Sequence, residues 1–145
     1  MYKKLLVFFL PCIFMQTLCS MTMNSLALEN KRIARAYYTA MAEKNIVALQ
    51  KYVDEDVVFV APLATVYGKE LFLERVQEFF TYSATLTIRS VFGSYDQGMV
   101  VFSLEYPRPI GIVEVAALLH IEEGLITKIE LFYDGRLFEK QEDAR

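Results

Sequence analysis

GIVEVAALLHI, at Gly111–Ile121, and ITKIELFY, at Ile126–Tyr133, decide the fold class of this sequence. In the first segment every second residue is apolar, whereas the positions between them include Glu114 and His120. Such alternation predicts a β-strand with one face toward a core. The turn Glu122-Glu123-Gly124 lies between the two segments, so they are expected to form an antiparallel hairpin.

Two segments before this hairpin are also predicted to be strands. These are Thr85–Tyr95 and Met99–Tyr106, followed by the turns Asp96-Gln97-Gly98 and Pro107-Arg108-Pro109. A β-branched run closed by proline, Val57–Pro62, predicts a further strand upstream. The sheet is therefore expected to be mostly antiparallel, with one apolar face and one mixed face.

Helical periodicity dominates the sequence before these strands. Asn24 or Ser25 is expected to cap a first helix, which ends at Lys44-Asn45. A second, shorter helix at 46–53 is expected to stop in the solvated acidic turn Asp54-Glu55-Asp56. A third helix is expected to place four apolar residues on one stripe: Phe72, Val76, Phe79 and Phe80. Helices first and strands afterwards predict an α+β fold, with three N-terminal helices packed on one face of the sheet.

The N-terminal segment differs from the rest of the sequence. Lys3 and Lys4 precede an apolar run, Leu5–Phe14, and small or polar residues follow it. This layout is typical of a secretory signal, and the run is shorter than the ~20 residues that a membrane span requires. Cleavage after Ser20 or Ala27 is expected to give an exported, periplasmic or secreted, protein.

A different start would change this interpretation. Translation from Met21 or Met23 would leave a cytoplasmic protein and make the upstream segment an artefact. The predicted organisation is a signal peptide or upstream segment at residues 1–23, a domain at residues 24–138 and a polar tail at residues 139–145.

Composition and charge argue against several classes of function. A net charge of -3 with scattered Lys and Arg does not suit a nucleic-acid surface or an anionic membrane. Both cysteines, Cys12 and Cys19, precede the domain, and His120 is the single histidine. We therefore expect no disulfide, thiol nucleophile, metal site or cofactor in the domain.

Six short segments follow one another in a familiar order: Tyr38–Asn45, Ala48-Leu49, Asp54–Phe59, Gly68-Lys69-Glu70, Glu123–Ile129 and Phe132-Tyr133-Asp134. In this order and spacing they resemble the nuclear transport factor 2-like, or SnoaL-like, superfamily. The resemblance implies a cone, in which helices close the concave face of a curved sheet around a largely apolar pocket. Members of the superfamily use this pocket for several reactions or only to bind ligands or partners, so the fold leaves the function open.

The ketosteroid isomerases of this superfamily offer a direct test. They use a tyrosine on the first helix, an aspartate base after the first strand and a second acid on a central strand. In this sequence Tyr37 falls on the tyrosine position, but Ala61 falls on the base and Ala117 on the second acid. A methyl group can neither accept nor donate a proton, so this mechanism is not expected.

Other polar residues are weaker catalytic candidates. Asp134 or Glu105 could act with Tyr37 in a lyase, isomerase or hydrolase, although capping the next turn is the simpler role for Asp134. His120 faces away from the pocket by strand parity. Arg89 and Glu105 could pair on the outer face of the sheet or contact a ligand.

Eight residues are expected to line the pocket: Tyr37, Phe59, Ala61, Phe80, Val115, Ala117, Leu119 and Tyr133. Tyr37 is the strongest candidate for ligand contact, because a buried tyrosine hydroxyl needs a polar partner. The leading prediction is a domain that binds a small hydrophobic ligand, and the alternatives are the enzyme described above and a non-catalytic dimeric interaction module. The apolar residues Leu118, Phe102 and Phe132, assigned to the mixed face of the sheet, favour a homodimer.

Overall fold

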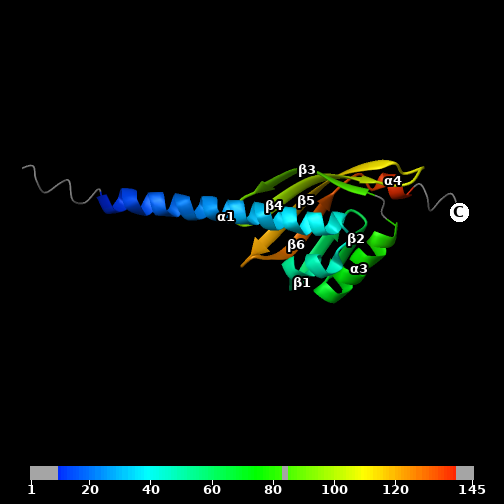
Figure 1. The fold of residues 1–145 in the computed structure, drawn as a ribbon, viewed down its shortest axis with the longest axis horizontal. Coiled ribbons are helices and arrows are strands. Elements are labelled where there is room, and N and C mark those ends of the chain that lie inside the picture. The colour runs from blue at the N-terminus through cyan, green and yellow to red at the C-terminus, as the bar shows by residue number, and fades with distance from the viewer. Residues whose placement is uncertain (1–9, 83–84, 140–145) are drawn as a thin grey trace, which may run out of the picture.

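The computed structural model describes residues 10–82 and 85–139 (Figure 1). In chain order the elements are α1 (Leu10–Ala42), α2 (Ile46–Leu49), the 3-10 helix η1 (Gln50–Tyr52), β1 (Val53–Ala61), β2 (Ala64–Tyr67), α3 (Lys69–Tyr82), β3 (Thr85–Gly93), β4 (Gln97–Glu105), β5 (Ile112–Glu122), β6 (Leu125–Phe132) and α4 (Arg136–Glu139).

The strands form one six-stranded sheet in the order β2-β1-β6-β5-β4-β3. Only the pair β1 and β6 is parallel, and the other neighbours in this sheet are antiparallel. The long helix α1 lies across β3 and β4, while α3 packs against β1 and β2 on the same side (Figure 1). The predicted α+β class, with helices on one face of a mostly antiparallel sheet, is therefore confirmed.

The alternation that predicted β5 places its apolar face in the core. Five residues of this strand are buried: Val113, Val115, Ala117, Leu119 and Ile121. Phe102 of β4 is buried on the same face of the sheet, because it pairs with Val115 of β5. The expectation that Phe102 lies on the mixed outer face is wrong, and its ring instead packs on Tyr38 with ring centroids 4.7 Å apart.

Two glycines and one asparagine set the distance between α1 and the sheet. A Cβ at Gly98 would lie 2.7 Å from the Cβ of Ala34, and a Cβ at Gly93 would collide with the backbone of α1. Asn30 is buried and donates from Nδ2 to the carbonyl oxygens of Ser94 and Tyr95, each at 3.0 Å. Helix and sheet therefore pack backbone to backbone at this point.

The end of α1 is fixed by its own hydrogen bonds. Lys44 has a positive φ of 53°, and the next amide, Asn45 N, donates to Ala40 O at 2.9 Å. This pattern closes the last turn and satisfies carbonyls that the helix would otherwise leave free. The Asn45 side chain then caps α2 by accepting from Ala48 N at 3.0 Å. The break between the two helices therefore falls at Lys44-Asn45, where the sequence predicted it.

The start of α1 differs from the prediction. The helix begins at Leu10 and passes without a break through Asn24 and Ser25, which were expected to cap it. Figure 1 shows this N-terminal part projecting beyond the sheet. Within 10–82 and 85–139, no helix has the length and apolar character needed to cross a membrane. The predicted positive start, Lys3 and Lys4, and the first part of the apolar run lie outside the described residues.

Three shorter segments also differ from the prediction. The acidic residues Asp54-Glu55-Asp56 belong to β1 rather than to a turn, and the pairing of β1 with β6 shifts register between Val53 and Val58. The strand β2 was not predicted, and neither was α4. The acidic residues lie beside irregular pairing and β2 lies at the edge of the sheet, where the alternation of apolar residues is weak. The helix α4 is only four residues long, too short for a helical period to be recognised.

Candidate functional site

Two adjoining cavities lie between the helices and the sheet. Cavity 1, of about 190 Å³, lies beneath α1 and α3, and cavity 2, of about 290 Å³, lies toward α4. Four side chains line both of them: Phe59, Phe79, Leu104 and Leu131. The two cavities therefore adjoin one another and share part of an apolar wall.

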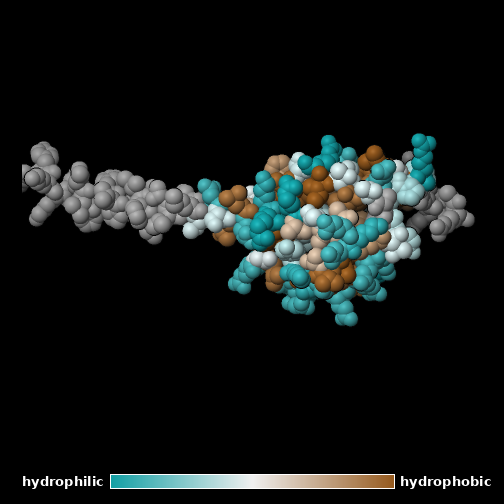
Figure 2. Space-filling model, in the orientation of Figure 1, coloured by the Kyte–Doolittle hydropathy of each residue, from teal (hydrophilic) through white to brown (hydrophobic). Residues whose placement is uncertain are grey.

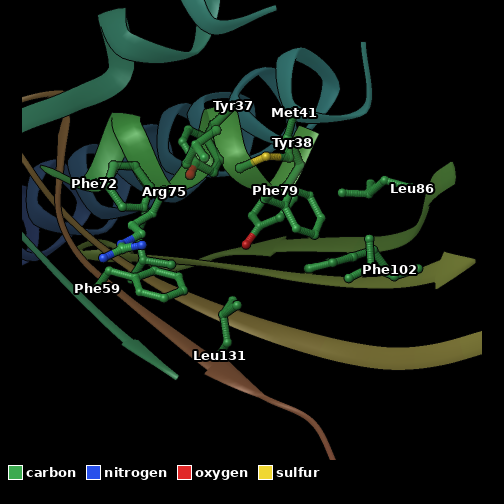
Figure 3. Close-up of a pocket in the computed structure, with 13 residues that line it drawn as sticks. Tyr37, Tyr38, Met41, Phe59, Phe72, Arg75, Phe79, Leu86, Phe102 and Leu131 are labelled. Carbon is green, nitrogen blue, oxygen red and sulfur yellow. The ribbon is translucent and has the colours of Figure 1, made fainter. Parts of the chain in front are cut away.

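Cavity 1 contains few polar groups, and most of its wall is aromatic or aliphatic. Tyr37 and Tyr38 reach it from α1, and Arg75 reaches it from α3 (Figure 3). The remaining side chains of the wall are Met41, Phe59, Phe72, Val76, Phe79, Leu86, Phe102, Leu104, Ile129 and Leu131. Such a wall favours an apolar ligand with a small polar end.

The tyrosine hydroxyls are the buried polar groups of cavity 1. Burial raises the pKa of Tyr37 and that of Tyr38 above their ordinary values, so both remain protonated donors at neutral pH. Among the described residues neither hydroxyl has a hydrogen-bond partner. No side-chain nitrogen or oxygen atom there is both fully buried and without a partner, so each hydroxyl oxygen has some accessible surface. Both hydroxyls therefore open onto the cavity, where a ligand oxygen or a water can bind them.

Cavity 2 has a second pair of tyrosines. Burial raises the pKa of Tyr106 to about 12 and also raises that of Tyr133. The ring of Phe138 from α4 packs edge-on against both, with ring centroids 5.5 Å from Tyr106 and 5.7 Å from Tyr133. This short helix therefore closes one end of the cavity with an aromatic cluster.

The structure places the eight predicted pocket residues in different environments. Tyr37 and Phe59 line cavity 1, whereas Ala61, Val115 and Tyr133 line cavity 2, as Phe59 also does. The other three predictions do not fit the described walls of the two cavities. These residues are Phe80, Ala117 and Leu119.

The three exceptions have simple physical causes. Ala117 and Leu119 have no exposed surface, because the core packs over that part of β5. Phe80 follows Phe79 on α3, and only Phe79 lies on the cavity side of the helix. Successive helical residues are about 100° apart, so Phe80 projects to a different side of α3 than Phe79 does.

Tyr38 and Arg75 were not among the predicted site residues. A signal for Arg75 exists in the sequence, because it follows Phe72 by three residues and precedes Phe79 by four. This spacing places a cation on the apolar stripe of α3. Tyr38 had no comparable signal, since its role depends on Phe102 facing inward.

The predicted acids lie away from the cavities. Glu105 is exposed at the end of β4, and Asp134 is exposed after β6. The Oδ1 atom of Asp134 accepts from the backbone N of Arg136 at 3.1 Å, which is the capping role expected from the sequence. Within the described residues neither acid lines either cavity, so an acid–base reaction of Tyr37 with one of them has no geometric support here.

The remaining candidates form ion pairs on the outer face of the sheet. Arg89 pairs with Glu114 at 2.9 Å rather than with Glu105. His120 Nε2 lies 2.9 Å from Glu130, which Lys128 also contacts at 2.9 Å. The hydrogen bonds with Lys128 and, to a lesser extent, with His120 hold the pKa of Glu130 below its ordinary value. In the part of the chain that the structure describes, no group of three or more His, Cys, Asp or Glu side chains is arranged to hold a metal.

Comparisons with solved structures support the fold. A nuclear transport factor 2-like protein of unknown function from Cytophaga hutchinsonii is 17% identical, with a TM-score of 0.66 over 75% of this chain and 94% of that one. A candidate ketosteroid isomerase from Kribbella flavida is 18% identical, with a TM-score of 0.67 over 74% and 79%. An epoxide hydrolase from M. tuberculosis is 13% identical, with a TM-score of 0.66 over 79% and 89%. At these identities the likeness shows the fold alone.

Comparison with protein families identifies the chain more closely. A search of curated proteins gave no match. The SnoaL-like domain family, however, matches residues 34–129, which is more than half of the 145-residue chain. The matched region contains the tyrosines of α1, the whole of α3 and the strands β1 to β5. This protein therefore belongs to the SnoaL-like domain family, of nuclear transport factor 2-like fold.

Proposed function

We propose that this protein binds a small, largely apolar molecule in the two adjoining cavities. The observation that carries the proposal is the pair of α1 tyrosine hydroxyls, Tyr37 and Tyr38, which open into an otherwise apolar wall. The larger cavity, of about 290 Å³, is close to the lower end of the usual range for ligand pockets, roughly 300–1,000 Å³, and the cavity of about 190 Å³ adjoins it. Two neutral donors in such a site would orient a ligand through its oxygen atoms.

A binding assay with a blocked cavity tests this proposal. Leu131 is half-buried and lines both cavities, so Leu131→Trp is expected to fill the space that the ligand needs. A panel of steroids, polyketides, terpenoids and fatty acids is screened by thermal shift, and the variant is expected to bind any hit at least about tenfold more weakly. At a ligand concentration of 100 Kd, binding stabilises the native protein by about 2.7 kcal/mol, which such a screen detects.

The control for this variant is Leu71→Trp. Leu71 is exposed on α3 and outside the walls of both cavities, so the added indole should leave ligand binding unchanged. The proposal is wrong if no compound in the panel stabilises the protein. It is also wrong if Leu131→Trp and Leu71→Trp bind a hit equally well.

We also propose that the protein forms a homodimer through the outer face of the sheet. Large apolar side chains gather on this face, on strands β3 to β6: Phe92, Met99, Ile112, Leu118 and Phe132. On the helix-covered side, Figure 2 shows hydrophilic residues interspersed with hydrophobic ones. Exposed apolar side chains interspersed with ion pairs, here Arg89–Glu114 and His120–Glu130, suit an interface that has both apolar and polar contacts.

Phe132→Glu is expected to convert such a dimer into a monomer. Phe132 is 54% exposed and pairs across the sheet with Ala116, so the substitution would place a carboxylate in the interface without disturbing the core. Sedimentation velocity of the wild type and the variant measures the change. Val47→Glu, at an exposed position on the helix α2 and away from the outer face of the sheet, is the matched control and should remain dimeric. A wild-type protein that sediments as a monomer would contradict the proposal.

Export is a further proposal, based on the N-terminal sequence pattern. The positions of the α1 contacts favour cleavage near Ser20 over cleavage after Ala27, because Gly93 packs against the backbone carbonyl of Ala27. Cleavage after Ala27 would also make the buried Asn30 the third residue of the mature chain, where the helix end frays. N-terminal sequencing of the protein from its natural host distinguishes these sites from each other and from a start at Met21 or Met23.

A further inference from the structure

Arg75 is the only charged residue among the described residues that line the two cavities. We propose that the natural ligand is an amphipathic carboxylate, whose apolar body lies in the cavities and whose carboxylate binds the guanidinium of Arg75. This inference rests on the proposed function and adds the chemical class of the ligand.

The position of Arg75 on α3 places it at the boundary between the apolar interior and water. Phe72, Val76 and Phe79 come from the same side of this helix and line cavity 1 with it. The Arg75 side chain is 58% exposed, and Figure 3 shows it beside Phe59 and Phe72. A ligand carboxylate at this position would stay partly hydrated, so its burial would not carry the large desolvation cost of a fully enclosed charge.

The guanidinium has donors left for a ligand. Its Nη1 donates to Glu78 at 2.8 Å, whereas Nη2 and Nε have no partner among the described residues. A guanidinium binds a carboxylate through two parallel hydrogen bonds, and the edge formed by Nη2 and Nε suits that geometry. The ion pair with Glu78 is exposed on both sides, so it contributes little stability and does not occupy Arg75 fully.

The tyrosines of cavity 1 fit the same ligand. Tyr38 and Tyr37 keep their protons because burial raises their pKa, and they donate to oxygen without adding charge. The four side chains shared by both cavities offer the apolar tail a path toward cavity 2, and each is hydrophobic: Phe59, Phe79, Leu104 and Leu131. Polar groups in the wall of cavity 1 and an apolar path toward cavity 2 match an amphipathic molecule.

The test compares two probes that differ only in the head group. Octanoate and octanol are titrated by calorimetry at pH 7.5 into the full-length protein and into Arg75→Gln. The variant is expected to bind octanoate about tenfold more weakly, because a charge-assisted hydrogen bond is lost, and to bind octanol unchanged. Arg89→Gln is the matched control, since Arg89 is 57% exposed and paired with Glu114 at 2.9 Å on the outer face.

A second variant changes the affinity in the opposite direction. Glu78→Gln removes the carboxylate that competes for Arg75, so it is expected to strengthen octanoate binding severalfold and leave octanol binding unchanged. A loss of selectivity in Arg75→Gln and a gain in Glu78→Gln would support the inference. If both probes bind and neither variant changes the ratio of their affinities, the inference is wrong while the proposed function stands. If neither probe nor any member of the screening panel binds, the proposed function fails and the inference fails with it.

Discussion

Gly98→Ala is expected to lower the free energy of unfolding by about 3 kcal/mol, at the upper end of the usual cost of overpacking a core. The added Cβ would lie 2.7 Å from the Cβ of Ala34 and 3.2 Å from the carbonyl oxygen of Asn30. Neither neighbour is the flexible end of a long side chain, so α1 itself would have to move away from β4. Urea unfolding followed by circular dichroism measures the loss.

A double-mutant cycle separates this contact from other effects of the substitution. Ala34→Gly alone is expected to cost about 1 kcal/mol, because glycine disfavours the helix. In that background Gly98→Ala should cost at least about 1 kcal/mol less than in the wild type, since the closest atom has gone. Gly135→Ala is the control, as its new Cβ would meet Leu63 at an ordinary 3.4 Å. Equal losses for Gly98→Ala with and without Ala34→Gly would show that the close packing of α1 on β4 is not the cause.

Asn30→Leu is the second substitution with a large expected effect, a loss of about 2–3 kcal/mol in the free energy of unfolding. Leucine has a similar size, but it cannot donate the two hydrogen bonds to Ser94 O and Tyr95 O, each 3.0 Å long. Both carbonyls lie in the turn between β3 and β4, and each loses a partner at a partly buried position. An unsatisfied buried polar group costs about 1–3 kcal/mol.

Asn24→Leu provides the matched control on the same helix. Asn24 is exposed, so this substitution should change the free energy of unfolding by less than about 0.5 kcal/mol. Urea titrations of both variants under the same conditions give the comparison. If Asn30→Leu were as stable as Asn24→Leu, the hydrogen bonds of Asn30 would not be what holds α1 to the β3–β4 turn.

The sheet could be predicted from the sequence where the signal is local and repeated. In β5 the alternation spans eleven residues, and all of its predicted inward positions are buried. The hairpin turn at Glu122-Glu123-Gly124 was also identifiable from its residue types, and Glu123 and Gly124 do adopt positive φ angles of 50° and 82°. Strong periodicity and turn chemistry agree here, so the sequence alone was sufficient.

Other features depend on contacts between distant parts of the chain. Asn24 and Ser25 are good capping residues, but a cap forms only where the preceding residues leave the helix, and here they continue it. Phe102 was assigned to the wrong face because a slip of one residue reverses every side chain in a strand, and only its pairing with Val115 fixes the register. Phe80 rather than Phe79 was predicted to line the pocket, because helical spacing alone does not fix how α3 is rotated about its axis above the sheet.

The candidate site was predictable only in part. Tyr37 was singled out from its helix face and Phe59 from the first strand, and both line cavity 1. Arg75 is not among the predicted residues; an arginine on an amphipathic helix is usually solvated, and only the folded structure brings it beside Phe59 (Figure 3). The empty volume itself has no signature in the sequence, because it depends on how the helices are spaced above the sheet.

Because β1 pairs in parallel with β6, the sheet cannot be completed until late in synthesis on the ribosome. β1 ends at Ala61, whereas its partner begins only at Leu125, so the two are made at well separated times. At about 5–20 residues per second, β1 waits on the order of several seconds for the strand that completes the sheet. During this interval the apolar side chains and the open edge of β1 are exposed to other nascent chains. Chaperones would therefore protect this part of the molecule in particular from aggregation. The wall of cavity 1, which includes Phe59 of β1 and Leu131 of β6, is therefore complete only after β6 has been made.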